Sequence, residues 1–416
     1  MQKCWCGNVD LKEFSADYWR CNACGTLVFK GEVSAEQLQV TDDESDFYGK
    51  QYWLKHQHDS FGYPDIHQRV RGDLTERNLH WLLTLLRYSR PPARVVELGC
   101  SHGSFVALLD QGGFEASGVE MSPWVVAFGH ETFDVPIMRG PIEALDLPEE
   151  SLDAIVLMDV LEHLPDPRAT MRHCLRLLKP EGLLLIQTPE FKQEMTYPAL
   201  VETQSRFLEN LKPVDHLYLF SRESVTRFFH ELGAGHVQFE PAIFAHYDMF
   251  LAVSRVPLEQ ASVEEIDKSL MATPRSRFVL ALLDVYRREA EGQRRLREEI
   301  VGLESRLSAS EDDRAARLQV IERQGDEIGR LSGLQPHLEH LQAQLRASEA
   351  ELAALRAERD VEVQRLRASL SESADREQRL RSELDTLTAR VEAKVGMRIR
   401  NRWSRMRGTG SPDGDR

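Results

Sequence analysis

The sequence predicts a doubly wound α/β fold, a Rossmann-like sheet covered by helices on both faces, in the middle of a chain of 416 residues. Apolar strand patterns alternate with helical patterns between residues 94 and 256, which indicates such a sheet. Residues 152–158 and 182–187 are apolar almost throughout, as parallel strands buried on both faces are. The first strand, 94–98, runs directly into a turn that contains glycines, where sheets of this type bind ligands.

Composition narrows the functional classes. The formal net charge of −15 argues against a general nucleic-acid-binding protein. The chain has no run of about 18 apolar residues that would suit a transmembrane helix. Its N-terminus has no apolar signal core, so we expect a cytoplasmic protein. Of the six cysteines, Cys100 and Cys174 lie in the apolar body and are expected to be buried thiols.

The other four cysteines predict a zinc-binding module at residues 1–30. They form two pairs, each followed by glycine, which resemble the knuckles of a zinc ribbon: Cys4, Cys6, Cys21 and Cys24. Four thiolates suit a tetrahedral Zn²⁺ with no open position, which is a structural site. The first pair has one intervening residue where a ribbon has two, and a disulfide is the alternative, although cytosolic proteins disfavour it. With few apolar side chains, this module is expected to need the metal to fold.

Residues 31–93 are interpreted as a lead-in. An acidic linker precedes the aromatic-rich segment 47–53, which is either a packing element or a lid that brings Tyr48 or Tyr52 near a ligand. Residues 65–88 show a helical stripe of apolar side chains, which Pro91 and Pro92 end.

The turn after the first strand has the features of a ligand-binding loop. Gly99 and Gly103 allow a sharp turn and close approach of a ligand, and Glu97 ends the strand before them. Ser101 stands where a dinucleotide-binding fingerprint would need a further glycine. Glu120 ends the second strand, 115–120, where a carboxylate accepts hydrogen bonds from a ribose diol. An ordinary strand–turn–helix corner is the alternative.

The remaining elements follow in alternation. Helices are expected at 104–111, 123–133, 166–178 and 221–232, a short strand at 136–138, and two closing strands, as a hairpin, within 235–254.

Five sequence blocks, in this order, resemble the class I S-adenosylmethionine-dependent methyltransferases over residues 45–256. They are Glu97-x-Gly99-x-x-x-Gly103, Glu120, the segment 141–148 (PIEALDLP), the segment 153–163 (DAIVLMDVLEH) and the segment 177–182 (LLKPEG). The resemblance implies a seven-stranded sheet and S-adenosylmethionine as the cofactor. It also implies a set of cofactor-binding residues: Glu97, Gly99, Cys100 and Gly103 at the methionine part, Glu120 at the ribose, Met121, Ile142 and Glu143 at the adenine, and Met158 and Asp159 beneath the sulfonium. Because Pro141 stands where the family often has Asp, a backbone carbonyl or Glu143 would hold the adenine amino group.

Two histidines are the candidate catalytic residues. An alcohol acceptor must lose its proton during methyl transfer, and a positioned imidazole does this well. His163 follows the fourth strand at the ligand-binding edge, and similar family members place a histidine over the acceptor pocket where this chain has His216. A structural, hydrogen-bonded role is the alternative for each. His246 and Tyr247 are weaker candidates to face the pocket.

Residues 257–396 are predicted to be helical, with a coiled coil as the main interpretation. Leucines, with Val391 at the end of the second series, recur at alternating spacings of three and four, as in 334–345 and 380–391. Isolated solvated helices are the alternative, and Gly333 and Pro336 predict a kink or hairpin at 333–336. We expect a homo-oligomer, a dimer or a trimer. In the tail 397–416, the segment 397–407 carries five arginines between Met, Ile and Trp. We expect it either to contact an anionic membrane surface or an acidic protein or to remain solvated.

A methyltransferase with a zinc module of this kind resembles enzymes of bacterial sugar and surface-glycan biosynthesis, and this resemblance implies O-methylation of a sugar or glycan in surface-polysaccharide synthesis. Sugar C-methyltransferases resemble it in their zinc module but usually add a second α/β domain where this chain has its helical region. A methyltransferase joined to a coiled coil resembles the enzymes that cap a growing O-antigen chain, which suggests a cytoplasmic protein at the inner membrane surface. A scaffold that binds the cofactor with little turnover is the other class, and a nicotinamide-dependent oxidoreductase is disfavoured by Ser101.

Overall fold

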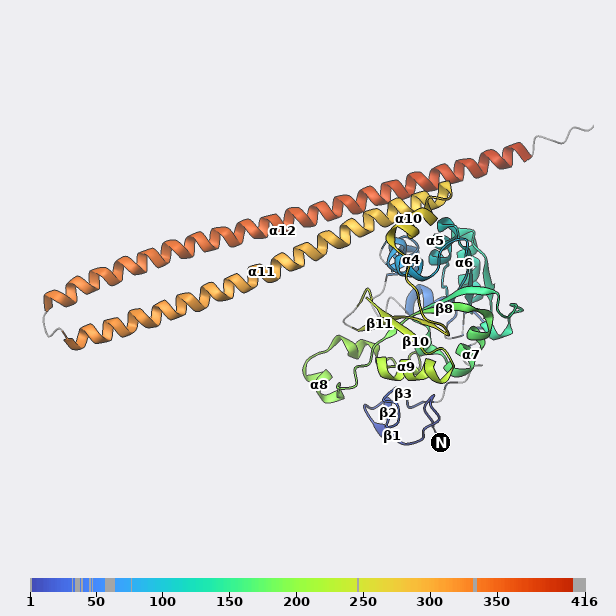
Figure 1. Ribbon diagram of the computed structural model, residues 1–416, viewed down its shortest axis with the longest axis horizontal. Coiled ribbons are helices and arrows are strands. Elements are labelled where there is room, and N and C mark those ends of the chain that lie inside the picture. The colour runs from blue at the N-terminus through green and yellow to red at the C-terminus, as the bar shows by residue number, and fades with distance from the viewer. Residues whose placement is uncertain are drawn as a thin grey trace, which may run out of the picture. The chain divides into compact units, whose positions relative to one another are not determined.

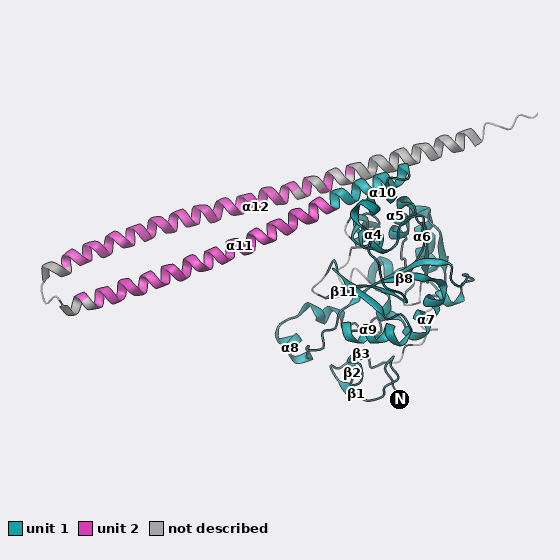
Figure 2. Ribbon diagram, viewed as in Figure 1, with its two compact units in different colours: residues 1–286 teal, residues 287–416 magenta. Residues whose placement is uncertain are grey.

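A computed structural model describes residues 2–31, 33, 38, 40–44, 46, 48–56, 64–75, 77–244, 247–331 and 335–406. The chain divides into two compact units, Met1–Tyr286 and Arg287–Arg416 (Figure 2). The first unit contains both sheets of the described chain, and the described part of the second consists of helix.

The first unit is built on a seven-stranded mixed sheet (Figure 1). Its strand order is β10-β11-β8-β7-β4-β5-β6, in which the last five strands are parallel and β10 and β11 form an antiparallel edge. This confirms the predicted seven-stranded α/β sheet. Strand bounds are β4 (Arg94–Leu98), β5 (Glu115–Glu120), β6 (Ile137–Arg139), β7 (Leu152–Met158), β8 (Leu178–Pro189), β10 (His236–Glu240) and β11 (Asp248–Ser254). The chain leaves β4 toward β5 on one side and returns to β7 on the other, so the end of β4 is the switch point.

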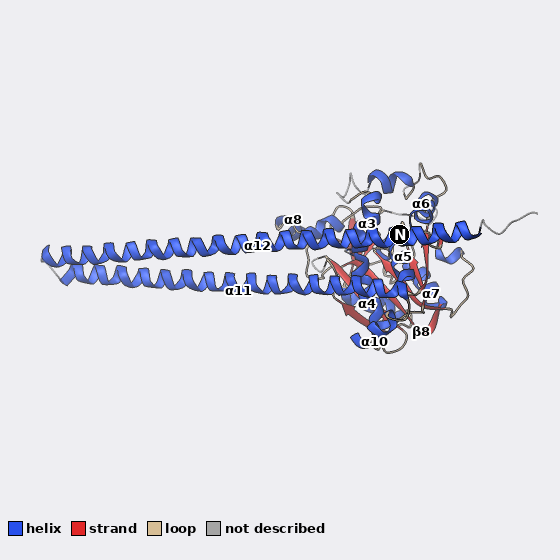
Figure 3. Ribbon diagram, turned by 90° about the horizontal axis from the view of Figure 1, so that it is seen from above, coloured by secondary structure: helices blue, strands red, loops and turns tan. Residues whose placement is uncertain are grey.

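Helices cover both faces of this sheet, as the view from above also shows (Figure 3). One apolar core lies under α7 and α9, and the other lies under α4, α5, α10 and the first turns of α11. The helices of this unit are α3 (Ile66–Thr75), α4 (Arg77–Tyr88), α5 (Ser104–Gly112), α6 (Pro123–Phe133), α7 (Pro167–Leu177), α8 (Tyr197–Glu202), α9 (Arg222–Glu231) and α10 (Val263–Leu270).

Two stretches that the sequence predicts to be helical each form two separate helices. Residues 65–88 form α3 and α4, and the residue between these helices lies outside the described chain. After α10 the chain turns at residues 271–273 before α11 begins at Pro274. The side chains of Thr273 and Ser276 cap this second helix reciprocally, and Pro274 has no N–H to continue the helix before it.

The cysteine-rich segment forms a second, smaller sheet that extends beyond residue 30. Its order is β1-β2-β3-β9, with antiparallel pairs throughout. The fourth strand comes from far along the chain, since Leu27 pairs with Leu219 and Val28 with Tyr218. The bounds are β1 (Leu11–Glu13), β2 (Tyr18–Cys21), β3 (Leu27–Phe29) and β9 (Tyr218–Leu219). Trp5 also packs edge-on to Phe228 of α9, with ring centroids 5.0 Å apart.

The second unit consists of the greater part of α11 (Pro274–Leu331) together with α12 (Gln335–Met406). Within this unit the two helices lie side by side in both views, and Arg381 Nε lies 3.8 Å from Glu289 Oε1 (Figures 1 and 3). Residues 332–334, which overlap the predicted break at 333–336, lie outside the described residues. Several of the predicted seam leucines stay half exposed, among them Leu345 at 46% and Leu355 at 54%. The coiled coil and the homo-oligomer remain predictions.

The basic tail that the sequence predicts lies largely outside the described residues. The side chains of residues 397–406 and the whole of 407–416 lie outside the described residues. Among the described helices, none combines the length and the apolar character needed to cross a bilayer.

Candidate functional site

A cavity of about 1060 Å³ opens at the carboxyl ends of β4, β5 and β7. Its lining includes nearly all of the residues that the sequence nominated: Glu97, Gly99, Cys100, Glu120, Met121, Ile142, Glu143, Met158, Asp159, His163 and His216. Gly103 is not part of the lining. It precedes α5 with a φ of 77°, and a Cβ there would lie 2.9 Å from Ile137 Cδ1. Gly103 therefore serves the turn and its packing.

The glycine turn presents backbone to the cavity. Gly99 has a φ of 71°, and a Cβ at this position would lie 2.6 Å from Val160 Cγ2, so only glycine fits. The thiol of Cys100 packs against Gly118, where an added Cβ would lie 2.3 Å from the sulfur. Cys100 and Cys174 are both buried, free thiols, as expected.

Glu97 brings an unsatisfied carboxylate to the edge of the cavity. The residue is 4% exposed, and its Oε2 has no hydrogen-bond partner among the described residues. Burial raises the pKa of this carboxyl well above its ordinary value, and the nearby Glu120 raises it further. A buried, unpaired oxygen of this kind is unfavourable unless a ligand donates to it. An ammonium group, such as that of a methionine moiety, fits this requirement.

Glu120 is held rigidly at the end of β5. Its carboxylate accepts hydrogen bonds from the backbone N–H groups of Ser101 at 3.0 Å, Met121 at 2.7 Å and Ser122 at 3.1 Å. Burial raises its pKa, and these three hydrogen bonds oppose that rise. A carboxylate oxygen accepts more than one hydrogen bond, so this fixed group retains capacity for the two hydroxyls of a ribose.

Other residues nominated for the cofactor line the cavity beyond the glycine turn. Ile142 is buried, and the carboxylate of Glu143 accepts a hydrogen bond from the hydroxyl of Thr170. Asp159 follows β7 with a φ of 58°, and its Oδ1 accepts a hydrogen bond of 3.1 Å from Gln187. Glu143 Oε1 accepts from Thr170 and its other oxygen retains acceptor capacity, so Glu143 and a backbone carbonyl both remain candidate partners for an adenine amino group.

His163 is held at the other end of the cavity by Asp215. Its Nδ1 lies 2.7 Å from the backbone oxygen of Asp215 and 3.1 Å from Oδ1 of the same residue. The hydroxyl of Tyr48 also donates to this Oδ1, at 2.9 Å. Burial opposes a charge on His163, but the Asp215 carboxylate outweighs it and raises the histidine pKa to about 9. In turn, His163 holds the pKa of Asp215 well below its ordinary value against the effect of burial.

His216 lies beside His163 in a different protonation state. The two rings have centroids 4.9 Å apart, and the Nδ1 of His216 lies 2.8 Å from the backbone oxygen of Asn210. Burial lowers the pKa of His216 to about 3, and the charge on His163 lowers it further. His216 is therefore neutral, with Nδ1–H donating to Asn210 and a lone pair left on Nε2.

Sequence reasoning missed several residues of this cavity. Glu162 and Asp215 immediately precede the two nominated histidines, and this adjacency was the available signal. Asp248, at the start of β11, also lines the cavity, and burial together with Asp159 raises its pKa to about 9. Tyr48 and Tyr52 both line the cavity as the lid interpretation required, and so does Tyr247, whereas His246 lies outside the described residues.

The four N-terminal cysteines converge in the smaller sheet. Their sulfurs all lie within 4.8 Å of one another, with 3.5 Å between Cys4 and Cys24 and 3.6 Å between Cys6 and Cys21. The sulfurs around a tetrahedral Zn²⁺ lie about 3.8 Å apart, given a Zn–S distance of about 2.3 Å. The donor set and its spacing therefore fit a zinc ion.

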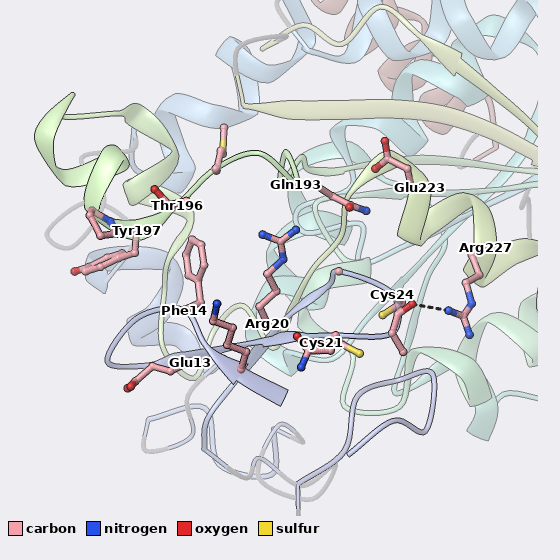
Figure 4. Close-up of a pocket in the computed structure, with 16 residues that line it drawn as sticks. Glu13, Phe14, Arg20, Cys21, Cys24, Gln193, Thr196, Tyr197, Glu223 and Arg227 are labelled. Carbon is pink, nitrogen blue, oxygen red and sulfur yellow. Dashed lines mark hydrogen bonds between the residues drawn. The ribbon is translucent and has the colours of Figure 1, made fainter. Parts of the chain in front are cut away.

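A second cavity, of about 570 Å³, lies against this cluster (Figure 4). Cys21 and Cys24 form part of its wall, together with Tyr197 of α8 and Arg227 of α9. The guanidinium of Arg227 donates a 2.9 Å hydrogen bond to the backbone oxygen of Ala23, between the two cysteines. This contact ties the cysteine loop to α9.

The part of the chain that carries the large cavity matches a known protein family. Residues 70–238 match the family described as "Methyltransferase domain". These residues form a class I S-adenosylmethionine-dependent methyltransferase domain. The matched residues include the glycine turn, Glu120 and both cavity histidines.

Relatives of the methyltransferase domain include two bacterial enzymes named "Ubiquinone biosynthesis O-methyltransferase". The protein from Xanthomonas campestris pv. campestris (strain B100) is 32% identical over 108 residues, 24% of this chain and 45% of that protein. The protein from Pseudomonas entomophila (strain L48) is 30% identical over 123 residues, 28% of this chain and 52% of that protein. The chain thus spans about half the length of the curated relatives it matches.

Solved structures similar to the chain include magnesium protoporphyrin IX methyltransferase from Synechocystis PCC 6803 with bound SAH. It is 17% identical, with a TM-score of 0.35, and the match covers 50% of this chain and 97% of that one. The YcgJ protein of Bacillus subtilis is 18% identical with the same TM-score of 0.35, over 42% of this chain and 99% of that one.

Proposed function

We propose that the protein transfers a methyl group from S-adenosylmethionine to a hydroxyl oxygen of a sugar or glycan in bacterial surface-polysaccharide synthesis. The observation that carries this proposal is one cavity with two chemically distinct ends: the glycine turn with Glu97 and Glu120, and the neighbouring His163 and His216. The methyltransferase domain and the relatives named O-methyltransferases support the reaction class.

The residues at the first end fit the cofactor. The free oxygen of Glu97 would accept from the methionine ammonium, and Glu120 would accept from the ribose hydroxyls. Met121 and Ile142 would flank the adenine. When bound, the cofactor supplies a methyl group already activated on a sulfonium, so the main task left to the protein is alignment of the acceptor.

The residues at the second end fit a hydroxyl acceptor. A neutral imidazole with a free lone pair accepts a proton, and an imidazolium donates a hydrogen bond to an oxygen that is gaining negative charge. The lowered pKa of His216 favours the first role for it, and the raised pKa of His163 favours the second. Around them the wall combines polar with aromatic side chains, which suits the hydroxyls and apolar faces of a sugar ring: Asn210, Lys212, Phe244, Tyr247 and Asp248.

The rest of the chain is assigned supporting roles in this proposal. The four cysteines hold a structural Zn²⁺, supported by the spacing of their sulfurs. The helices of the second unit form a coiled coil that joins copies of the chain, supported by the heptad spacing and by the half-exposed Leu345 and Leu355. The protein acts in the cytoplasm, with its basic tail at the inner membrane surface or on an acidic partner.

The test uses the full chain and labelled S-adenosylmethionine. Calorimetry with S-adenosylhomocysteine is expected to show one site per chain, and the labelled methyl group is expected to appear in surface glycan or its sugar-nucleotide precursors. Transfer to a phenolic acceptor alone would replace the glycan in the proposal. Cofactor binding without transfer to either acceptor would instead favour a scaffold, and no binding of S-adenosylhomocysteine would overturn the methyltransferase function.

A further inference from the structure

We propose that Glu162, His163 and His216 bind a divalent transition-metal cation at the acceptor end of the cavity. The three candidate ligand atoms, one carboxylate oxygen and one ring nitrogen from each histidine, all lie within 4.8 Å of one another. Ligand atoms that lie about 2.0–2.2 Å from one ion are separated by about 3–4.3 Å. The cluster therefore needs only small side-chain movements to close on a cation.

The carboxylate of Glu162 is satisfied on one side only. Its Oε2 accepts a 2.9 Å hydrogen bond from the hydroxyl of Thr188, whereas Oε1 has no partner in the described structure. The residue is 1% exposed, so bulk water has little access to the unpaired oxygen. Oε1 lies 3.9 Å from Nε2 of His163, too far for a hydrogen bond but suited to two ligands of one ion. A cation between them would satisfy this oxygen.

Both histidines are oriented as metal ligands usually are. Nδ1 of His163 is held by Asp215, and Nδ1 of His216 is held by the backbone oxygen of Asn210. Such outer contacts fix the ring orientation. Nε2 of His216 keeps its lone pair, and Nε2 of His163 would gain one by releasing its proton to solvent as the ion binds. One histidine thus has a carboxylate behind it and the other a backbone carbonyl, which are common supports of metal-bound imidazoles.

The donor set selects the class of cation. Two nitrogens and one carboxylate oxygen suit Mn²⁺, Fe²⁺ or Zn²⁺ better than Mg²⁺ or Ca²⁺, which favour oxygen ligands alone. All three residues line the cavity, so the remaining coordination positions face the space where the acceptor would lie. Here the inference rests on the proposed function, because the ion would bind the acceptor hydroxyl and lower its pKa.

In such a transfer the acceptor oxygen loses its proton to solvent water and forms the new C–O bond. The C–S bond of the sulfonium breaks, and its electron pair stays on sulfur, so charge and atoms balance. His163 and His216 would then hold the ion. The ion, rather than the imidazole of His216, would be the group that makes the acceptor hydroxyl easier to deprotonate.

The test measures cation binding separately from catalysis. Full-length protein that retains its cysteine-bound zinc is treated with a chelator and titrated with Mn²⁺, and free Mn²⁺ is followed by electron paramagnetic resonance. One site per chain is expected. Glu162→Gln, which preserves shape and the bond from Thr188, and His163→Gln are each expected to weaken Mn²⁺ binding about 100-fold. The matched control changes the neighbouring pair His230→Asn and Glu231→Gln on α9, outside the cavity, and should bind Mn²⁺ normally.

The outcomes separate this inference from the proposed function. Thermal unfolding of each variant verifies that it is folded. Equal Mn²⁺ binding by the wild type, both cavity variants and the control would overturn the cation site, as would binding no tighter than about 1 mM. Mn²⁺ binding without methyl transfer to any acceptor would remove the O-methyltransferase proposal and leave the cation site intact. Methyl transfer that is unaffected by chelation would remove the role of the cation in the reaction.

Discussion

The cysteine cluster and the histidine cluster are both compact groups of metal-type ligands, but they differ in what surrounds them. Cys4, Cys6, Cys21 and Cys24 provide four sulfurs, enough to close a tetrahedral site. Glu162, His163 and His216 provide three donors on the wall of the large cavity, so further ligands must come from that cavity. This difference is the reason why we propose a structural role for the cysteine cluster and a role at the acceptor for the histidine cluster.

The sheet that carries the cysteine cluster is nevertheless connected to the histidine cluster by hydrogen bonds to the backbone. The hydroxyl of Tyr18, in β2, lies 2.9 Å from the backbone oxygens of both Lys212 and His216. A structural defect in the cysteine sheet therefore has a direct route to the acceptor end of the cavity. The following changes separate effects on folding from effects on chemistry, in order of decreasing size.

The largest effect is expected from Cys24→Ser. Structural zinc sites contribute about 10–16 kcal/mol to small zinc-dependent folds, and the loss of one thiolate removes much of that contribution. Zinc content should fall from one ion per chain to none, and the thermal midpoint should fall with it. Cys174→Ala, a buried thiol outside the cluster, is the control and should keep its zinc. Full zinc occupancy in the Cys24 variant would refute the four-thiolate assignment.

Trp5→Ala is expected to destabilise the protein without removing a ligand. The indole is 6% exposed, packs against Phe228 and donates a 2.8 Å hydrogen bond to Thr26. Removing a large buried aromatic side chain costs about 3–5 kcal/mol of unfolding free energy, which urea denaturation measures. Trp5→Phe should lose less because it keeps a ring. Zinc content that falls as far as in the Cys24 variant would show that packing and metal binding are inseparable here.

Asp215→Asn should act on chemistry rather than on folding. The side chain orients His163 and accepts from Tyr48, and loss of such a supporting carboxylate reduces activity or metal affinity by about 10–100-fold. The kcat for methyl transfer should fall, while the dissociation constant of S-adenosylhomocysteine should stay unchanged. If cofactor affinity falls by the same factor, Asp215 supports the whole cavity instead of its acceptor end.

The smallest effect is expected from Glu231→Gln, near the cysteine loop. Glu231 pairs with Arg168 and with Arg227, and the hydrogen bond from Arg168 in particular lowers its pKa. A depressed carboxyl pKa stabilises the fold above the ordinary carboxyl pKa, and this contribution disappears as pH falls through the folded value. At pH 7 the variant should lose less than about 1 kcal/mol, and at pH 3 it should match the wild type. A difference that grows toward low pH would contradict this sign.

Local pattern predicted much of the sheet and its ligand-binding turn. The bounds expected for β5 and α6, and the apolar strand at 152–158, agree with the structure because hydrophobic periodicity and Ser122 and Pro123 at the start of α6 are local signals. The residues nominated for the cofactor, apart from Gly103, line one cavity because the carboxyl ends of parallel strands meet there.

The remaining features depend on contacts between distant residues. The pairing of β3 with β9 joins residues that no local pattern relates, and β9 is only two residues long. The Asp215 contact to His163 follows a backbone turn at Val214 with a φ of 72°, a conformation that valine rarely adopts. Heptad spacing in the second unit is the same whether a helix pairs within one chain or between chains, so it did not predict that α11 and α12 lie side by side.

The pairing of β3 with β9 also has a consequence for how this protein is made. The ribosome produces residues 27–29 about 190 positions before Tyr218 and Leu219, which at about 5–20 residues per second is a delay of roughly 10–40 seconds. During that time the young chain would carry four nucleophilic thiols and an unpaired strand edge. Early capture of zinc would protect the thiols from oxidation, while the edge would wait for its partner strand to emerge.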